Sequence, residues 1–230
     1  MQFKHALVHG TLIKRYKRFL ADITLDNGDV VTAHCTNSGS MKSCLEEGAE
    51  VFLSPVDDPK RKTRFTWEMI KINDRWVGIN TANPNQLVHE AILNKTIPGL
   101  DTYDRAIREV KFDESRLDVF AENNEEQCAI EVKNVSMRDN DRALFPDAKT
   151  TRGLKHLHTL IRLKKEGMRA VMVYVIQRTD VSSFAPAKEI DPDYAAGLKQ
   201  AVASGVEVFP LQVNVTPTEI SILKLLPYTV

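Results

Sequence analysis

The sequence holds 230 residues, which is enough for one large domain or two smaller ones. Its 31 lysines and arginines balance 31 aspartates and glutamates, which argues against a strongly electrostatic nucleic-acid binder. No apolar run approaches the roughly 20 residues that a membrane helix needs, so no membrane partner is expected. The three cysteines fit no zinc spacing and the N-terminal residues lack the apolar core of a signal peptide, which together favour a cytoplasmic protein with reduced thiols.

The first 82 residues predict a small all-β barrel. Short apolar segments alternate with polar turns, and Asp26-Asn27-Gly28-Asp29 is a strong hairpin signal. Asn73-Asp74 marks a second hairpin towards the end of this region. Strands are expected at residues 9–13, 19–25, 30–35, 49–54, 65–72 and 76–79. Their number and spacing fit an oligonucleotide-binding (OB) barrel, a fold of about five strands.

Two basic runs lie in predicted loops of this barrel and are candidate DNA contacts. They comprise Lys14, Arg15, Lys17 and Arg18, and Lys60, Arg61, Lys62 and Arg64. The aromatic residues Tyr16, Phe19, Phe65 and Trp67 lie close to these runs, and OB barrels combine basic and aromatic side chains to bind backbone and stack bases. The alternative is that Phe19 and Trp67 belong to the barrel core and that the basic runs are solvated loops.

A helix is predicted from Asn83, with Asn83 as its N-cap and Pro84 in the first helical position. Its apolar stripe is Leu87, Val88, Ala91 and Ile92, and Pro98-Gly99 is expected to end the element. Glu90 lies at the edge of the stripe, where it is either a ligand that faces inward to a metal or a surface residue. The boundary between two domains, 1–82 and 83–230, is therefore expected at residues 83–85.

The next strands carry the candidate catalytic residues. A strand over 105–112 carries Glu109, and two further strands, 116–120 and 128–135, flank a wholly polar turn. In the last strand Glu131 and Lys133 alternate with apolar residues and so share one face. If the two strands pair, Asp118 joins them on one side of a sheet. The plain alternative is an exposed hairpin with an ordinary cross-strand Glu–Lys face.

Two carboxylates and a lysine at this spacing are the ingredients of a site that cuts phosphodiesters. Carboxylate oxygens suit Mg²⁺, which keeps several waters and accepts substrate phosphate as a ligand. A lysine can orient or help to deprotonate the attacking water. We therefore predict catalytic roles for Asp118, Glu131 and Lys133, and a Mg²⁺ or Mn²⁺ site formed by Asp118 and Glu131 with help from Glu90 or Glu109.

The rest of the chain completes a mixed α/β domain. After a polar loop over 136–150, Thr150 or Thr151 caps a helix over 152–166 that carries Arg152, Lys155 and His156 as candidate phosphate and DNA contacts. A buried strand over 169–177, a helix over 191–205 and strands over 206–215 and 220–226 follow. The order of helix, three-strand meander, helix and strand is the one expected of a restriction-endonuclease-like core with a mixed sheet.

Several segments of the chain are specific enough to indicate a family. The chain resembles the sugar fermentation stimulation protein A (SfsA) family of bacteria and archaea. The matching segments span most of the chain: L-I-K-R-Y-K-R-F-L-A-D-I (12–23), H-C-T-N-S-G-S-M (34–41), K-R-K-T-R-F-T-W-E (60–68), N-Q-L-V-H-E-A-I (85–92), S-R-L-D (115–118), I-E-V-K-N-V (130–135) and F-P-D-A-K-T-T-R-G-L-K-H-L (145–157).

The resemblance implies an N-terminal OB-like barrel, a C-terminal PD-(D/E)XK nuclease-like domain, DNA binding and a role in regulating sugar metabolism. Carried over by residue, the nuclease motif falls on Asp118, Glu131 and Lys133. Glu90 takes the helix position where many such enzymes carry an extra acid. One departure is that the opening Pro-Asp of the motif is Leu117-Asp118 here.

Two functions follow from these observations. The first is a metal-dependent DNA nuclease, with single- or double-stranded DNA as partner. The alternative is a non-catalytic DNA-binding regulator of sugar metabolism genes, which keeps the nuclease architecture and binds DNA through the two basic runs. A homodimer is compatible with either function.

Overall fold

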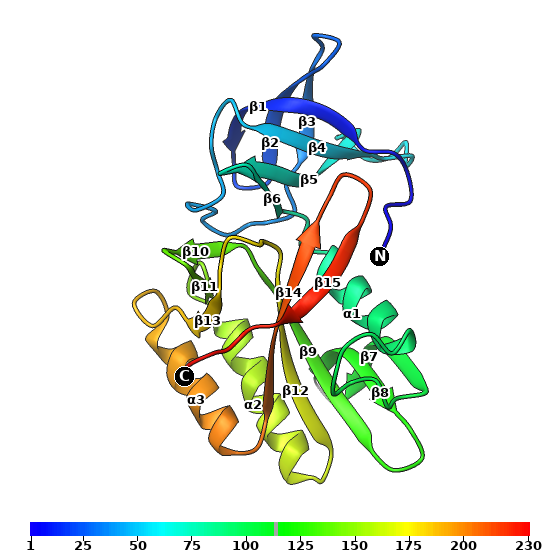
Figure 1. Cartoon of the computed structure of the whole chain (residues 1–230), viewed down its shortest axis with the longest axis vertical. Coiled ribbons are helices and arrows are strands. Elements are labelled where there is room, and N and C mark those ends of the chain that lie inside the picture. The colour runs from blue at the N-terminus through cyan, green and yellow to red at the C-terminus, as the bar shows by residue number, and fades with distance from the viewer. Residues whose placement is uncertain (113–114) are drawn as a thin grey trace.

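The structure is a computed structural model, and it describes residues 1–112 and 115–230. Figure 1 shows a β-barrel formed by the first part of the chain above a larger α/β domain formed by the rest. Residues 113–114, between the strands predicted over 105–112 and 116–120, lie outside the described part. Among the described helices, none is long and apolar enough to cross a membrane.

The first six strands build the barrel. They are β1 (Val8–Tyr16), β2 (Leu20–Leu25), β3 (Val30–His34), β4 (Glu50–Pro55), β5 (Phe65–Ile72) and β6 (Arg75–Gly78). Strand order β3-β2-β1-β4-β5 closes into a barrel because β3 also pairs with β5, while β6 extends β5 as a hairpin. Trp67 is fully buried in the barrel core, whereas Phe19 is 49 % exposed. The alternative that both aromatic residues belong to the core is therefore correct for Trp67 only.

Residues that tolerate a positive φ angle form the two predicted hairpin turns of the barrel. Gly28 has φ +89°, a left-handed conformation that glycine adopts without steric cost, and it lies in the turn between β2 and β3. Asn73 and Asp74, with φ of +50° and +56°, make the tight turn between β5 and β6. Both predicted hairpins are therefore present.

The second domain is built on a six-stranded mixed sheet with the order β15-β14-β12-β9-β8-β7. Its strands are β7 (Arg105–Phe112), β8 (Ser115–Glu122), β9 (Gln127–Val135), β12 (Arg169–Ile176), β14 (Glu207–Val215) and β15 (Ile220–Leu225). The three central strands β9, β12 and β14 are parallel, and the outer strands are antiparallel to their neighbours. The prediction of a mixed α/β sheet is confirmed.

Helices cover both faces of this sheet. Helix α1 (Asn83–Leu93) packs against the face that includes Val132 and Val173, whereas α2 (Thr151–Lys165) and α3 (Pro192–Ala203) pack against the face that includes Met172 and Tyr174. The Thr150 hydroxyl caps α2 by accepting the Gly153 N–H at 2.9 Å. Asn83 does not cap α1, because it is the first helical residue and its side-chain amide donates to buried Glu68 at 2.9 Å.

The loop predicted over 136–150 is partly wrong. It contains β10 (Met137–Asp139) and β11 (Arg142–Phe145), which form a small three-stranded sheet with β13 (Ser183–Pro186). Strand β11 pairs in parallel with β13, whose residues come about 40 positions later in the chain. Each strand is too short to show a clear alternation by itself, so this long-range pairing is not visible in the local pattern.

The two domains are joined by a buried polar network. Arg178 is fully buried, and its guanidinium donates to the Asp180 carboxylate at 2.6 and 2.9 Å. The same group donates to the Ser136 carbonyl at 2.6 Å and to the carbonyl of Ser43, a barrel residue, at 3.3 Å. The N-terminal residues also cross the predicted boundary, because Met1 packs against the core of the second domain.

Candidate metal centre

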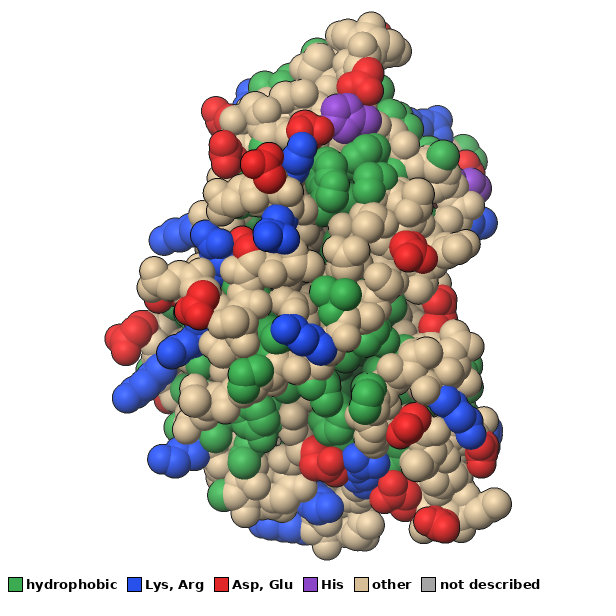
Figure 2. Space-filling view, in the orientation of Figure 1, with side chains coloured by type: hydrophobic (Ala, Val, Ile, Leu, Met, Phe, Trp, Pro, Cys, Tyr) green, Lys and Arg blue, Asp and Glu red, His purple; other side chains and the backbone are tan. Residues whose placement is uncertain are grey.

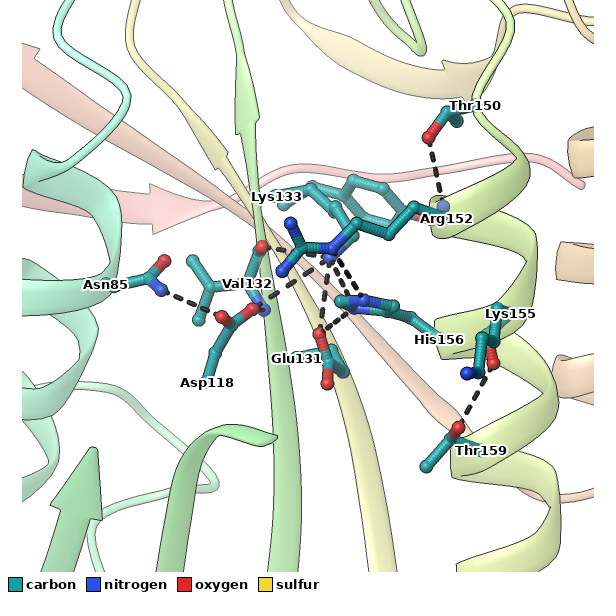
Figure 3. A network of polar contacts seen from close by, with 12 residues as sticks. Asn85, Asp118, Glu131, Val132, Lys133, Thr150, Arg152, Lys155, His156 and Thr159 are labelled. Carbon is teal, nitrogen blue, oxygen red and sulfur yellow. Dashed lines mark hydrogen bonds and ion pairs between the residues drawn. The ribbon is translucent and has the colours of Figure 1, made fainter. Parts of the chain in front are cut away.

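Asp118 lies where the ladder between β8 and β9 ends. The strands pair from Glu122–Gln127 as far as Val119–Ile130. Beyond this pair the Asp118 carboxylate takes the place of a strand carbonyl, because its Oδ2 accepts the Val132 N–H at 2.8 Å. Asn85, in the first turn of α1, donates to Oδ1 at 2.9 Å. These two hydrogen bonds hold the carboxylate beside β9, as Figure 3 shows.

Glu131 comes from the middle of β9 and is almost completely buried, with 2 % of its side chain exposed. Its neighbours Ile130 and Val132 point into the core on the α1 side, so Glu131 faces α2 as the alternation predicts. Within the described residues its carboxylate accepts hydrogen bonds from His156 on α2 and from Lys133, two residues further along β9.

Lys133 places its ammonium group among all the other members of the cluster. The Nζ atom lies 3.3 Å from Glu131 Oε2, 3.9 Å from Asp118 Oδ2 and 3.2 Å from His156 Nδ1. It also donates to the Val132 carbonyl at 3.2 Å, and its side chain is 13 % exposed. The structure therefore brings the three predicted catalytic residues together.

His156 completes the cluster from α2, one helical turn after Arg152. Its Nδ1 is hydrogen-bonded to Glu131, and the Arg152 Nε–H donates to its Nε2 at 3.3 Å. One ligand atom each from Asp118, Glu131 and His156 lie within 4.8 Å of one another. The sequence predicted His156 only as a DNA contact, because nothing local shows that this turn of the helix packs over Glu131.

The electrostatics of the cluster suit a cation. Burial raises the pKa of Asp118, the nearby Glu131 carboxylate raises it further, and Lys133 only partly offsets both. Burial acts to raise the pKa of Glu131 as well, but the His156 hydrogen bond and the Lys133 charge outweigh it and leave that pKa lowered. Two carboxylates this close favour a proton or a metal ion between them. Two carboxylates and an imidazole are also a donor set that divalent metals accept.

The other two predicted metal ligands lie elsewhere. Glu90 accepts a hydrogen bond from Gln86 at 2.7 Å and lies 3.9 Å from the N-terminal amine. It is five residues after Asn85, and five residues turn an α-helix by about 140°, so it cannot share the face that Asn85 presents to Asp118. Glu109 is exposed on β7, where it pairs with Arg116 at 3.0 Å. The structure brings neither acid to the metal centre.

The first basic run was predicted as a loop, but Lys14 and Arg15 lie in β1 and pair with β2, and only Lys17 and Arg18 form the β1–β2 turn. The run is partly used within the barrel. Arg15 donates to the carbonyls of Asn37 and Gly39 at 2.9 and 3.0 Å, and Arg18 donates to the Ser38 carbonyl at 2.6 Å. Lys14 and Lys17 are exposed, with the Lys14 ammonium 5.7 Å from the centre of the Tyr16 ring.

The second basic run lies in the β4–β5 loop. Lys60, Lys62 and Arg64 are exposed, whereas Arg61 contacts the hydroxyls of Thr63 and Thr66 at 3.4 Å. On α2, Arg152 is exposed beside His156, but Figure 3 places Lys155 apart from the cluster. On the face drawn in Figure 2, basic and acidic side chains are interspersed, in agreement with the zero net charge.

Comparison with known proteins assigns each domain to a family model. A family model described as "SfsA N-terminal OB domain" matches residues 13–79, and one described as "Sugar fermentation stimulation protein RE domain" matches residues 82–219. Proteins described as "Sugar fermentation stimulation protein homolog" are similar over nearly the whole chain. The one from Geobacter sulfurreducens is 50 % identical over 96 % of this chain and 95 % of its own, and that from Geotalea uraniireducens is 48 % identical over 96 % of each.

A solved structure agrees with this result. Its title is "The structure of Pyrococcus Furiosus SfsA in complex with Ca2+", and it superposes with a TM-score of 0.90 at 27 % identity. The match covers 100 % of this chain and 98 % of that chain. The barrel of β1–β5 is therefore an OB domain, as the strand count predicted.

Proposed function

This chain belongs to the sugar fermentation stimulation protein (SfsA) family, and we propose that it is a DNA-binding protein that hydrolyses phosphodiester bonds at a divalent-metal centre. The observation that carries the proposal is the convergence of Asp118, Glu131 and His156 ligand atoms within 4.8 Å, with the Lys133 ammonium 3.3 Å from Glu131. The metal is Mg²⁺ or Mn²⁺, and the domain that holds it is of the PD-(D/E)XK type.

The Pyrococcus furiosus relative supports a hard-cation site, because its structure was solved in complex with Ca²⁺. Calcium takes oxygen ligands, which in this chain Asp118 and Glu131 supply side by side. The strand arrangement supports the nuclease assignment as well, since the two acids and the lysine come from adjacent strands of a mixed sheet with helices on both faces.

When bound, a divalent ion supplies Lewis-acid activation of the scissile phosphate and lowers the pKa of water. The chain's own residues do the rest. Asp118 and Glu131 hold the cation, and the hydrogen bonds from Val132 and Asn85 fix the Asp118 carboxylate. Lys133 lies where it can orient the water that attacks phosphorus in line with the leaving oxygen. Exposed Arg152 can neutralise the charge that develops on the phosphate.

Residues of the barrel support the DNA-binding part of the proposal. The first basic run spans the end of β1 and the β1–β2 loop, and the second occupies the β4–β5 loop; these are the loops that flank the ligand face in OB folds. Leu20 pairs with His34 and Ala33 pairs with Phe65, so both loops end against β3. Phe19, 49 % exposed in the β1–β2 loop, offers a ring on which a base can stack.

The test is cleavage of fluorophore-labelled single- and double-stranded DNA with Mg²⁺ or Mn²⁺, by wild-type protein and by Glu131→Gln. We expect metal-dependent products from the wild type and none from the variant. A wild type that binds DNA but releases no product with either metal would refute the catalytic proposal and leave the non-catalytic regulator. Cleavage that survives in Glu131→Gln would show that the activity comes from another site or a contaminant.

A further inference from the structure

A polar cleft of about 310 Å³ lies between the barrel and the second domain. The barrel contributes Arg18 and residues 36–39, and the second domain contributes residues 144–150. A cleft of this size holds a single nucleotide or base and not a DNA duplex, whose major groove alone is about 12 Å wide.

The cleft is lined by residues on or next to two elements that carry the metal centre. Asn134, which lines it, directly follows Lys133 on β9, and Thr150, which also lines it, caps the helix that carries Arg152 and His156. Thr150 lies two residues before Arg152, whose Nε–H donates to His156, so the cleft reaches the N-terminal end of α2 next to the residues of the metal centre.

Asp147 gives the cleft its chemical character. It is half-buried, and the described residues provide no hydrogen bond or ion pair for its carboxylate. The carboxylate lies against the backbone of Gly39, where an added Cβ atom would come 1.9 Å from Oδ2. Most of the other polar groups around it are paired, such as Asn37 with Ser136 and Asn134 with Gln177. An acceptor with no partner among the described residues thus lines a cleft in which most other polar groups are satisfied.

We propose that this cleft receives the base of the nucleotide next to the scissile phosphate, and that Asp147 accepts a hydrogen bond from the exocyclic amino group of that base. The inference rests on the proposed DNA binding. A carboxylate repels phosphate but pairs with the amino group of cytosine, as it does in base readout elsewhere. Cytosine and adenine carry this group on their pairing edge, whereas thymine and uracil present a carbonyl oxygen there. Asp147 is therefore a specificity residue that disfavours thymine and uracil.

The sharpest comparison uses the single-stranded oligonucleotides dC12 and dU12, whose bases differ in the exocyclic group at position 4, amino in cytosine and carbonyl in uracil, and in the proton that uracil carries on N3. Binding is measured by fluorescence anisotropy in Ca²⁺ at pH 7.5, with strand integrity checked on a gel. We expect wild-type protein to bind dC12 about tenfold more tightly, the discrimination of one charged hydrogen bond. Asp147→Asn, which offers both a donor and an acceptor, should bind the two strands equally.

Two further variants separate a binding role from a structural one. Gly39→Ala keeps the charge of Asp147 but pushes its carboxylate aside, so it should also lose the preference for dC12. Glu189→Gln removes one exposed acid outside the cleft and should keep the preference. Thermal melting of each variant confirms that it is folded.

The outcomes separate this inference from the proposed function. Equal binding of dC12 and dU12 by the wild type, or a preference that survives in folded Asp147→Asn, overturns the role of Asp147 while DNA binding stands. Failure of the wild type to bind either strand overturns both.

Discussion

The amide of Val132 donates its hydrogen bond to the Asp118 carboxylate at 2.8 Å, where the ladder between β8 and β9 has ended. One carboxylate thus serves as a substitute strand acceptor and as a proposed metal ligand. This double use places Asp118 beside Glu131 without a loop or a flexible side chain between them. The proposed metal centre is consequently part of the sheet itself.

Asp118→Asn should stabilise the metal-free protein while it abolishes metal binding. The asparagine oxygen still accepts the Val132 N–H, and its amide can pair with a flipped Asn85. The charge that burial and Glu131 disfavour is removed. We expect the melting temperature to rise by about 2–4 °C, which for a chain of this size corresponds to about 1 kcal/mol. Asp118→Ala is the control, because it also loses the acceptor for Val132 and should not gain stability.

Asp118→Asn also tests how the stability of the wild type depends on pH. The pKa of Asp118 is raised in the folded state, so its contribution to stability is present below the unfolded pKa and is lost as pH rises through the folded pKa. In EDTA, the melting temperature of the wild type should therefore fall relative to that of Asp118→Asn over this range and then stay parallel. A difference between the two proteins that does not change with pH would contradict this assignment.

His156→Gln tests whether His156 is a ligand or only positions Glu131. Imidazole suits Ni²⁺ far better than Mg²⁺, which prefers hard oxygen ligands. If His156 is a ligand, the variant should lose about tenfold or more in Ni²⁺ affinity and much less in Mg²⁺ affinity, measured by titration calorimetry. An equal loss for both metals would assign His156 to positioning Glu131 through their hydrogen bond.

Lys133→Met should uncouple catalysis from metal binding. Methionine retains most of the apolar stem but removes the ammonium that lies 3.3 Å from Glu131. Groups that act on the attacking water typically contribute on the order of 10²–10⁴ in rate, so we expect kcat to fall by that factor while Mn²⁺ still raises the melting temperature. Lys155→Met, on α2 but apart from the cluster, should cleave DNA like the wild type.

The basic β4–β5 loop should account for part of the salt dependence of DNA binding. Replacing Lys60, Lys62 and Arg64 by glutamine removes three exposed cations, and each phosphate contact on a single strand contributes about 0.7 to the slope of log K against log salt. We expect this slope to decrease by about 2. A matched triple of exposed lysines on the second domain, Lys165, Lys199 and Lys224, should leave it unchanged when replaced by glutamine.

The sequence predicted the parts of the centre that adjacent strands supply. Asp118, Glu131 and Lys133 lie in one hairpin, so period-two alternation and a polar turn were sufficient to bring them together. The positions of His156 and Glu90 depend instead on how a helix rotates and packs on the sheet, which no local pattern specifies. Asn85 was missed for the same reason, although a polar residue in the first turn of α1 was a usable signal.

The interior position of Arg178 has a consequence for how the whole molecule unfolds. Its guanidinium bridges a barrel carbonyl and a carbonyl of the second domain, with no exposed surface of its own. Separating the domains would remove the acceptors that Ser43 supplies, and a hydrogen bond of a charged group typically contributes about 1.5–3 kcal/mol. The barrel and the sheet should therefore melt in one cooperative transition.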